Sequence, residues 1–113
     1  MKEIKAIIQP FMLSKVVDAL KKIPHFPGIT VTKVQGFGRE KGEGAHHRIM
    51  EDLIDYVPKV KIEIVVNDEM LDIVVDAILE YAHTGNKGDG KIFIHDLSDV
   101  VRIKTKERGK TAV

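Results

Sequence analysis

The chain has 113 residues, 43% hydrophobic and 31% charged, which is enough for one domain (residues 1–113) with its own core. Its 18 basic and 17 acidic residues leave a net charge of +1, which argues against a nucleic-acid partner. Because cysteine is absent and no apolar run approaches the length of a membrane span, disulfides, thiolate chemistry and membrane insertion are excluded. We therefore expect a cytoplasmic protein.

The first third of the chain predicts a strand, a helix and a second strand. The apolar run Ile4–Ile8 stops at Pro10. Beyond Thr30 the chain alternates and is β-branched, which predicts a strand running towards Phe37. Between the two strands, apolar residues recur at the spacing of one helix face: Leu13, Val16, Val17, Leu20 and Ile23.

Residues 38–57 form an unusually long connection. They are charged and glycine-containing at their start, and strands are predicted on both sides. A loop of about 20 residues in a small domain is typically functional or mobile.

The second half repeats the order of the first. Residues Val60–Val66 alternate as a strand, and Asn67 or Asp68 is expected to cap the next helix. A strand at Lys91–His95 and a strand-like segment at Val100–Ile103 follow. The expected inner face of the helix is Met70, Ile73, Val74, Ala77, Ile78 and Tyr81.

An internal repeat indicates the topology. A shift of 58 residues places Ile4 on Ile62, and Val16–Ala19 on the identical Val74–Ala77. Two such units predict an α+β, ferredoxin-like βαββαβ sandwich with both helices on one face of an antiparallel sheet. Apolar residues such as Ile7 and Val65 then lie on the uncovered face, which a homo-oligomer would cover.

A glycine-rich stretch, Thr84–Phe93, joins the second helix to the last predicted strand. Gly85, Gly88 and Gly90 permit positive φ and bare N–H groups, while Lys87 and Lys91 add positive charge. The stretch therefore suits phosphate, the alternative being a plain glycine-rich turn.

Further cations stand elsewhere in the chain. The N–H groups of the glycine loop could surround a polyphosphate together with four cationic side chains: Arg39, Lys91, Arg102 and Lys104. Spacing leaves open whether these groups meet within one subunit or across two.

Five segments together resemble the PII signalling proteins, the nitrogen-regulatory family: Lys5–Phe11; Gly36–Arg39; Pro58–Val66; Thr84–Gly85 with Gly88–Phe93; and Val101–Ile103 with Thr105 and Glu107–Gly109. The resemblance implies a homotrimer that holds ATP or ADP in each intersubunit cleft. It also implies an exposed T-loop, residues 38–57, that engages a target protein, for which a membrane transporter is one candidate. The glycine loop, residues 84–91, would bind the phosphates, and a C-terminal segment, residues 102–113, would complete the cleft.

The resemblance also implies individual nucleotide contacts. Phosphate contacts would be Arg39, Gly88, Asp89, Gly90, Lys91, Arg102 and Lys104, where Lys104 stands in place of the usual Arg. Gly38 and Ile103 would also belong to the nucleotide site. Adenine and ribose contacts would be Ile7, Gly28, Ile29, Thr30, Gly36, Phe37 and Val65. Simple packing is the alternative for Ile7 and Val65.

One departure from the family concerns the effector. Glu40 stands where the family commonly has Gln, next to Lys41. A carboxylate still ligates Mg²⁺ but repels a dianionic oxoacid. We therefore expect 2-oxoglutarate binding to be weakened or absent, with Lys59 kept as a candidate anion contact.

A second departure lies in the T-loop. Asp52 stands where the family has its uridylylated Tyr, and Met50 where cyanobacterial relatives have a modified Ser, so neither modification is expected. A possible docking face runs along one side of a short helix, the alternative being a segment packed on its own base. Its residues are Ile49, Leu53 and Tyr56, and Arg48 is expected in the same partner-binding loop.

A metal site is the alternative function for the T-loop. His46 and His47, with carboxylates nearby, suit a transition metal, although adjacent histidines do not share a helix face. The T-loop is also similar to that of a PII branch associated with heavy-metal efflux.

Other functions fit the sequence less well. An acylphosphatase would carry its signature between the first strand and helix, whereas the similar segment here, Val34–Arg39, follows the second strand. An RNA-binding domain of this fold needs aromatic strand motifs that are missing. We therefore expect a non-catalytic regulator with, at most, slow ATP hydrolysis.

Overall fold

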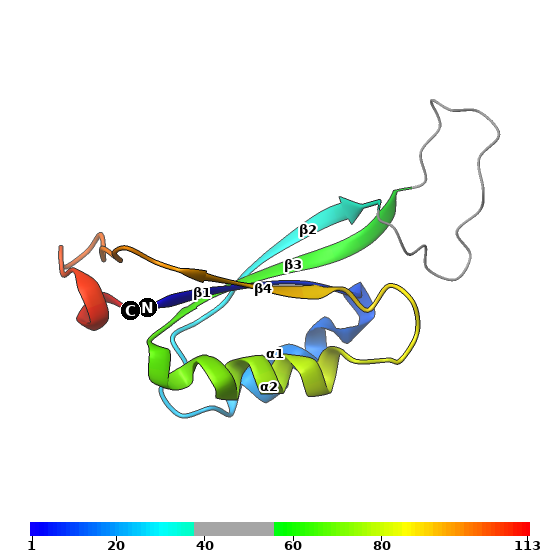
Figure 1. Ribbon diagram of the computed structural model, residues 1–113, viewed down its shortest axis with the longest axis horizontal. Coiled ribbons are helices and arrows are strands. Elements are labelled where there is room, and N and C mark those ends of the chain that lie inside the picture. The colour runs from blue at the N-terminus through cyan, green and yellow to red at the C-terminus, as the bar shows by residue number, and fades with distance from the viewer. Residues whose placement is uncertain (38–55) are drawn as a thin grey trace.

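The computed structural model describes residues 1–37 and 56–113. Its elements follow the predicted order (Figure 1). The strands are β1 (Lys2–Ile8), β2 (Thr30–Gly36), β3 (Val57–Val66) and β4 (Lys91–Asp96). The α-helices are α1 (Leu13–Lys21) and α2 (Leu71–Ala82), and short 3₁₀ helices span Pro10–Met12, Asp68–Met70 and Gly109–Ala112. No helix in the described ranges is long and apolar enough to cross a membrane.

The four strands form one antiparallel sheet in the order β2-β3-β1-β4. At the centre of the sheet, Ile4 of β1 pairs with Ile64 of β3 on one side and with Ile94 of β4 on the other. Both helices lie on the same side of the sheet (Figure 1). The predicted α+β, ferredoxin-like arrangement is confirmed.

The internal repeat is visible in the backbone. β1 ends at Ile8 and β3 ends at Val66, which is 58 residues later. The 3₁₀ helices that follow, Pro10–Met12 and Asp68–Met70, and the α-helices after them begin at the same offset. The two halves therefore use the same transition from strand to helix.

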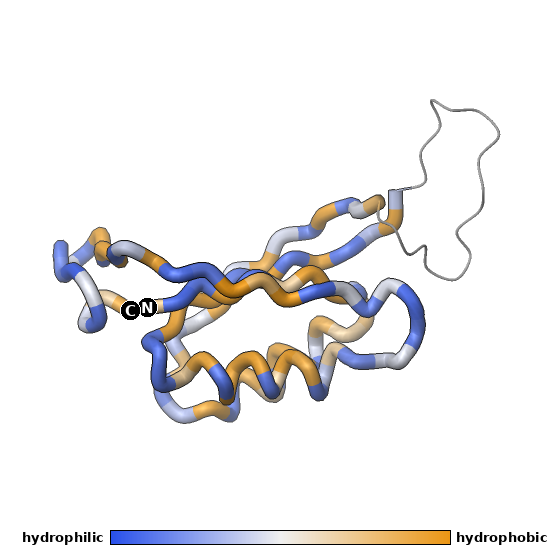
Figure 2. Tube along the Cα trace, in the orientation of Figure 1, coloured by the Kyte–Doolittle hydropathy of each residue, from blue (hydrophilic) through white to orange (hydrophobic). Residues whose placement is uncertain are grey.

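The core lies between the helices and the sheet. Hydrophobic positions alternate with hydrophilic ones along the strands (Figure 2), so each strand presents one apolar face. The most deeply buried side chains are aliphatic, and burying each contributes on the order of 1.5–3 kcal/mol. They include Ile4, Ile8, Val16, Leu20, Ile62, Ile64, Val66, Val74 and Ile78.

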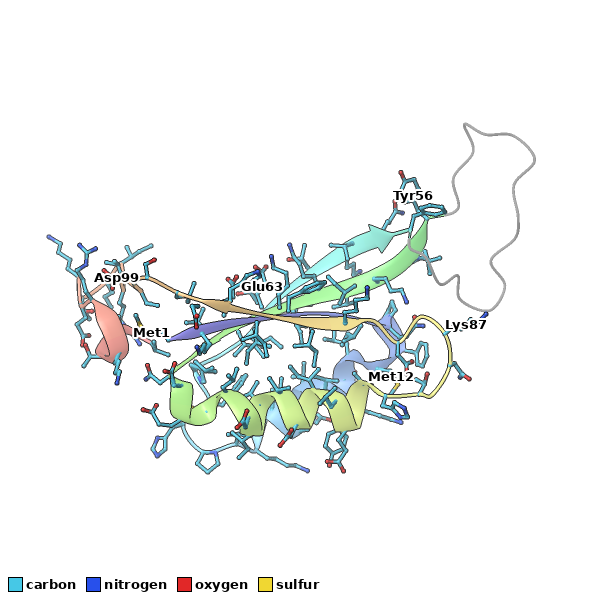
Figure 3. All side chains as sticks on the ribbon, viewed as in Figure 1. Met1, Met12, Tyr56, Glu63, Lys87 and Asp99 are labelled. Carbon is cyan, nitrogen blue, oxygen red and sulfur yellow. The ribbon has the colours of Figure 1, made fainter. Side chains whose placement is uncertain are left out.

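The sheet face away from the helices, here called the open face, mixes charged and apolar residues. Ile7 and Val65 lie on it, half-buried, as predicted. Lys5 pairs directly with Glu63, and Lys61 Nζ lies 3.7 Å from Glu63 Oε1. Figure 3 shows Glu63 pointing away from the helices. That a second copy covers this face stays a prediction.

Two expectations about α2 are wrong. Neither Asn67 nor Asp68 caps α2, because the 3₁₀ helix Asp68–Met70 comes first and the N-cap position of α2 is Met70. Asn67 Nδ2 instead donates to Lys110 O at 3.3 Å, and Asp68 Oδ1 accepts from the Met1 ammonium group. Ile73 and Tyr81 are 50% and 41% exposed, since the buried face of the helix is centred on Val74, Ile78 and Ala82.

The expected strand at Val100–Ile103 is also wrong. The chain folds back on itself there, and Val101 makes only an isolated bridge to Arg108. Because that bridge pairs residues within the C-terminal segment, residues 101–108 form a separate hairpin and add no strand to the sheet.

Candidate functional site

The glycine loop connects α2 to β4 at one end of the sheet. Gly85, Gly88 and Gly90 have φ values of 85°, 93° and 99°, which side chains with a Cβ rarely adopt. Lys87 projects at the tip of this loop (Figure 3). The positive φ values are confirmed; that this loop turns successive N–H groups towards one anion stays a prediction.

Gly90 is where the loop meets the sheet. A Cβ added there would overlap the carbonyl oxygen of Ile7, at the end of β1. Lys91, the next residue, pairs with Ile7 in the β1–β4 register. Only glycine permits this approach, so the loop is held directly against the end of the central strand.

Asp89 holds the beginning of the loop. Its Oδ2 accepts hydrogen bonds from the N–H groups of Thr84 at 2.8 Å and Gly85 at 2.9 Å, and its Oδ1 accepts one from the Thr84 hydroxyl. Partial burial disfavours the charged form, but these hydrogen bonds outweigh that effect and keep the pKa of Asp89 below its usual value. The carboxylate thus faces its own loop.

Lys59 joins the loop to β3. Its Nζ donates a hydrogen bond to the carbonyl of Gly88, and burial lowers the pKa of its ammonium group despite the nearby Asp89 carboxylate. The side chain is half-buried, beside Gly36 of β2. Lys59 therefore lies next to the loop, as an anion contact there requires.

A hollow lies towards the other end of the sheet. It has a volume of about 500 Å³ and brings together four residues expected on the adenine and ribose side: Gly28, Ile29, Thr30 and Val65. Pro27, Glu3 and Glu63 also line it. Sequence reasoning missed Glu63, although strand alternation places it on the same face as Val65.

The hairpin of residues 101–108 lies at the same end of the sheet as the chain termini (Figure 1). Asp99 holds its base: it accepts hydrogen bonds from Arg108 Nε at 2.8 Å, Val100 N at 2.8 Å and Gly109 N at 3.1 Å. The hydrogen bond from Arg108 is the largest cause of the lowered pKa of Asp99. Ile103, between Arg102 and Lys104, is 94% exposed.

The predicted contacts therefore divide between two ends of the molecule. Lys91 and Asp96 are the two ends of β4, about 17 Å apart at roughly 3.3 Å per residue. The glycine loop lies before Lys91, while the hairpin lies beyond Asp96 (Figure 3). One phosphate group therefore cannot contact both Gly88–Lys91 and Arg102 of the same chain.

Several predicted residues lie outside the described part of the chain: Gly38, Arg39, Glu40, Lys41, His46, His47, Arg48, Ile49 and Leu53. Phe37 and Tyr56, at the two edges of that segment, are each 56% exposed. Among residues 1–37 and 56–113, no three His, Cys, Asp or Glu side chains are grouped as a metal site would require.

The fold and the glycine loop define a ferredoxin-like domain with a candidate anion site at one end of its sheet. The profile of the family described as "Nitrogen regulatory protein P-II" matches residues 1–107. The chain is 49% identical to "Nitrogen regulatory protein P-II" of Pasteurella multocida, over all of both chains. It is 50% identical to "Nitrogen regulatory protein P-II 1" of Escherichia coli K12 and 48% identical to a P-II protein of Azospirillum brasilense, again over all of both chains.

The chain therefore belongs to the P-II family of nitrogen regulatory proteins, which are signalling regulators. The resemblance stated from the five sequence segments is confirmed. These relatives are named for regulation rather than for a chemical reaction.

Proposed function

We propose that this chain is a PII-type sensor that binds ATP or ADP in clefts between the three subunits of a homotrimer. The observation that carries this proposal is the separation of the expected contacts to two ends of the sheet. The glycine loop of one copy and the hairpin and hollow of the next would together surround one nucleotide.

A site built from two different ends of the chain requires a particular kind of assembly. The contact is head-to-tail, because the loop end of one copy faces the hairpin end of another; such contacts form a ring when the rotation between copies closes, and an open filament when it does not. The resemblance to PII proteins supplies the number three. In this arrangement Lys59, Lys91 and the loop amides approach the phosphates from one subunit, and Arg102 and Lys104 approach from its neighbour.

The output of the sensor is a target protein bound through the T-loop in the cytoplasm. ATP and ADP control the target only if they bind two T-loop states with different affinities. Mg²⁺ held by Glu40 beside the γ-phosphate would supply that difference. No catalytic step is required.

Mixed trimers test the shared cleft. Lys91→Ala removes a cation from the loop side, and Arg102→Ala removes one from the hairpin side, so each variant alone should lose most ATP binding in isothermal titration. If the two variants are co-refolded, each mixed ring regains one intact cleft, and about one quarter of the sites return for random mixing. If each site were contained within one subunit, the co-refolded mixture would regain no ATP binding. A monomer in analytical sedimentation would contradict the trimer.

The effector expectation has its own test. In the presence of Mg-ATP, titration with 2-oxoglutarate should show weak or no binding, because the Glu40 carboxylate repels the oxoacid. Glu40→Gln should strengthen the binding. Micromolar affinity in the unaltered protein would overturn the expectation.

A further inference from the structure

Asp89 has a different environment from the other charged residues of the glycine loop. Both of its carboxylate oxygens already accept hydrogen bonds from Thr84 and Gly85, which begin the loop. The Thr84 hydroxyl also accepts a hydrogen bond from the N–H of Asn86 at 3.1 Å. Four hydrogen bonds, three of them from the consecutive N–H groups of residues 84–86, therefore depend on the Asp89 carboxylate and the Thr84 hydroxyl.

These contacts fix the part of the loop that precedes the candidate anion contacts. Gly88 and Gly90 flank Asp89 and both have positive φ. Gly88 is joined to β3 through Lys59, and Gly90 packs against Ile7 of β1. With Asp89 joined to Thr84 and Gly85, the loop is held at three places, and the orientation of its N–H groups is set before any ligand arrives.

A carboxylate directed at the ligand would act against phosphate binding, because like charges repel. Directed into the loop, the same carboxylate accepts N–H groups that would otherwise have no fixed direction, and its charge-assisted hydrogen bonds are stronger than neutral ones. We infer that Asp89 is a positioning residue of the nucleotide site, acting with Thr84 through hydrogen bonds and not through contact with the ligand. This inference rests on the nucleotide binding proposed above.

Paired substitutions separate positioning from ligand contact. Asp89→Ala removes every acceptor and should weaken Mg-ATP binding on the order of tenfold in isothermal titration. Asp89→Asn loses the charge but keeps an oxygen for the two N–H groups and an NH₂ group that can donate to Thr84, so it should stay within about threefold of the unaltered protein. Asp76→Ala, the same change on exposed α2, is the control and should bind normally.

Thr84 gives a second, milder pair. Thr84→Val keeps the shape of the side chain but loses the hydroxyl, and should weaken Mg-ATP binding about threefold. Thr84→Ser keeps the hydroxyl and should bind Mg-ATP with the affinity of the unaltered protein. In the ligand-free protein, hydrogen exchange at the amides of Thr84 and Gly85 should accelerate in Asp89→Ala and change little in Asp89→Asn.

Two results would overturn the inference. If Asp89→Asn binds as weakly as Asp89→Ala while ligand-free exchange is unchanged in both, the carboxylate acts by charge on the ligand or its metal. If Asp89→Ala alters neither exchange nor affinity, Asp89 positions nothing. Failure of the unaltered protein to bind Mg-ATP would count against the proposed function itself, and ligand-free exchange would then decide alone whether Asp89 holds the loop.

Discussion

At the scale of single residues, Gly90 shows how the backbone of the site depends on one missing side chain. Its φ of 99° and its contact with the Ile7 carbonyl both require glycine. Gly90→Ala should therefore destabilise the protein by about 2 kcal/mol or more, combining backbone strain with overlap. Urea denaturation measures this change.

Gly109 provides the matched control for Gly90. Its φ is 77°, but an added Cβ would meet nothing within 4 Å. Gly109→Ala should cost only the backbone strain, about 1 kcal/mol. Equal destabilisation by the two substitutions would contradict the account of Gly90.

A second residue-scale prediction concerns acid. The N-terminal ammonium group of Met1 lies 2.8 Å from Asp68 Oδ1, and this hydrogen bond is the main cause that holds the pKa of Asp68 below its usual value. Because the folded pKa is depressed, the stabilisation is present above the unfolded pKa and is lost as pH falls through the folded value.

The stability difference between the unaltered protein and Asp68→Asn should therefore be full at neutral pH and shrink only in strong acid, below about pH 4. Thermal unfolding across that pH range measures it. Asp72→Asn, in the first turn of α2, controls for the loss of one carboxylate. A difference that persists undiminished to pH 2 would mean that the ion pair is not its source.

At the scale of elements, the two halves of the candidate site are a loop and a hairpin, and an aspartate holds each. Asp89 joins to backbone N–H groups within the glycine loop, and Asp99 joins to Arg108, Val100 and Gly109 at the base of the hairpin. Neither segment has a hydrophobic core of its own. Local charge-assisted hydrogen bonds supply the rigidity that packing supplies elsewhere.

Asp99→Ala should therefore loosen the hairpin and leave the glycine loop unchanged. Hydrogen exchange at Val100 and Gly109 should accelerate, and ATP binding should weaken because Arg102 and Lys104 lose their fixed position. Exchange at Thr84 and Gly85 serves as the internal control. Acceleration at both places would indicate general destabilisation instead.

At the scale of the whole molecule, the antiparallel sheet determines which residues can cooperate. It sets the glycine loop at one end and the hairpin at the other (Figure 1), so in the proposed trimer each chain would contribute to two different clefts. A nucleotide held by two subunits would stabilise the assembly as well as the fold.

Thermal stability should therefore increase with ATP concentration, and the free energy of unfolding should rise by about 2.7 kcal/mol at 100 times the dissociation constant. Lys91→Ala should abolish the increase in a thermal scan, and an increase that remained would place the nucleotide elsewhere.

Much of the fold follows from the sequence alone. Apolar residues spaced at every second position predict the strands, and apolar residues at helical spacing predict the helices. The repeat of Val16–Ala19 at Val74–Ala77 predicts the topology, because two copies of one strand-helix-strand unit can pack in only a few ways. The glycines at 85, 88 and 90 predict the loop, since positive φ is a local property. Family membership is also contained in the sequence segments.

Other features depended on contacts between residues distant in sequence. Ile73 and Tyr81 have the spacing of a buried face, but the way α2 packs on the sheet leaves them exposed. The chain at Val100–Ile103 has strand composition, yet hydrogen bonds from Arg108 and Gly109 to Asp99 fold it into a hairpin. The contact between Gly90 and Ile7 arises from the pairing of β1 with β4, and the separation of Lys91 from Arg102 arises from the length of β4 between them. Sequence spacing supplies the groups of the site, and only the tertiary structure decides which of them can meet, because distance in space is set by the packing of elements that are far apart in the chain.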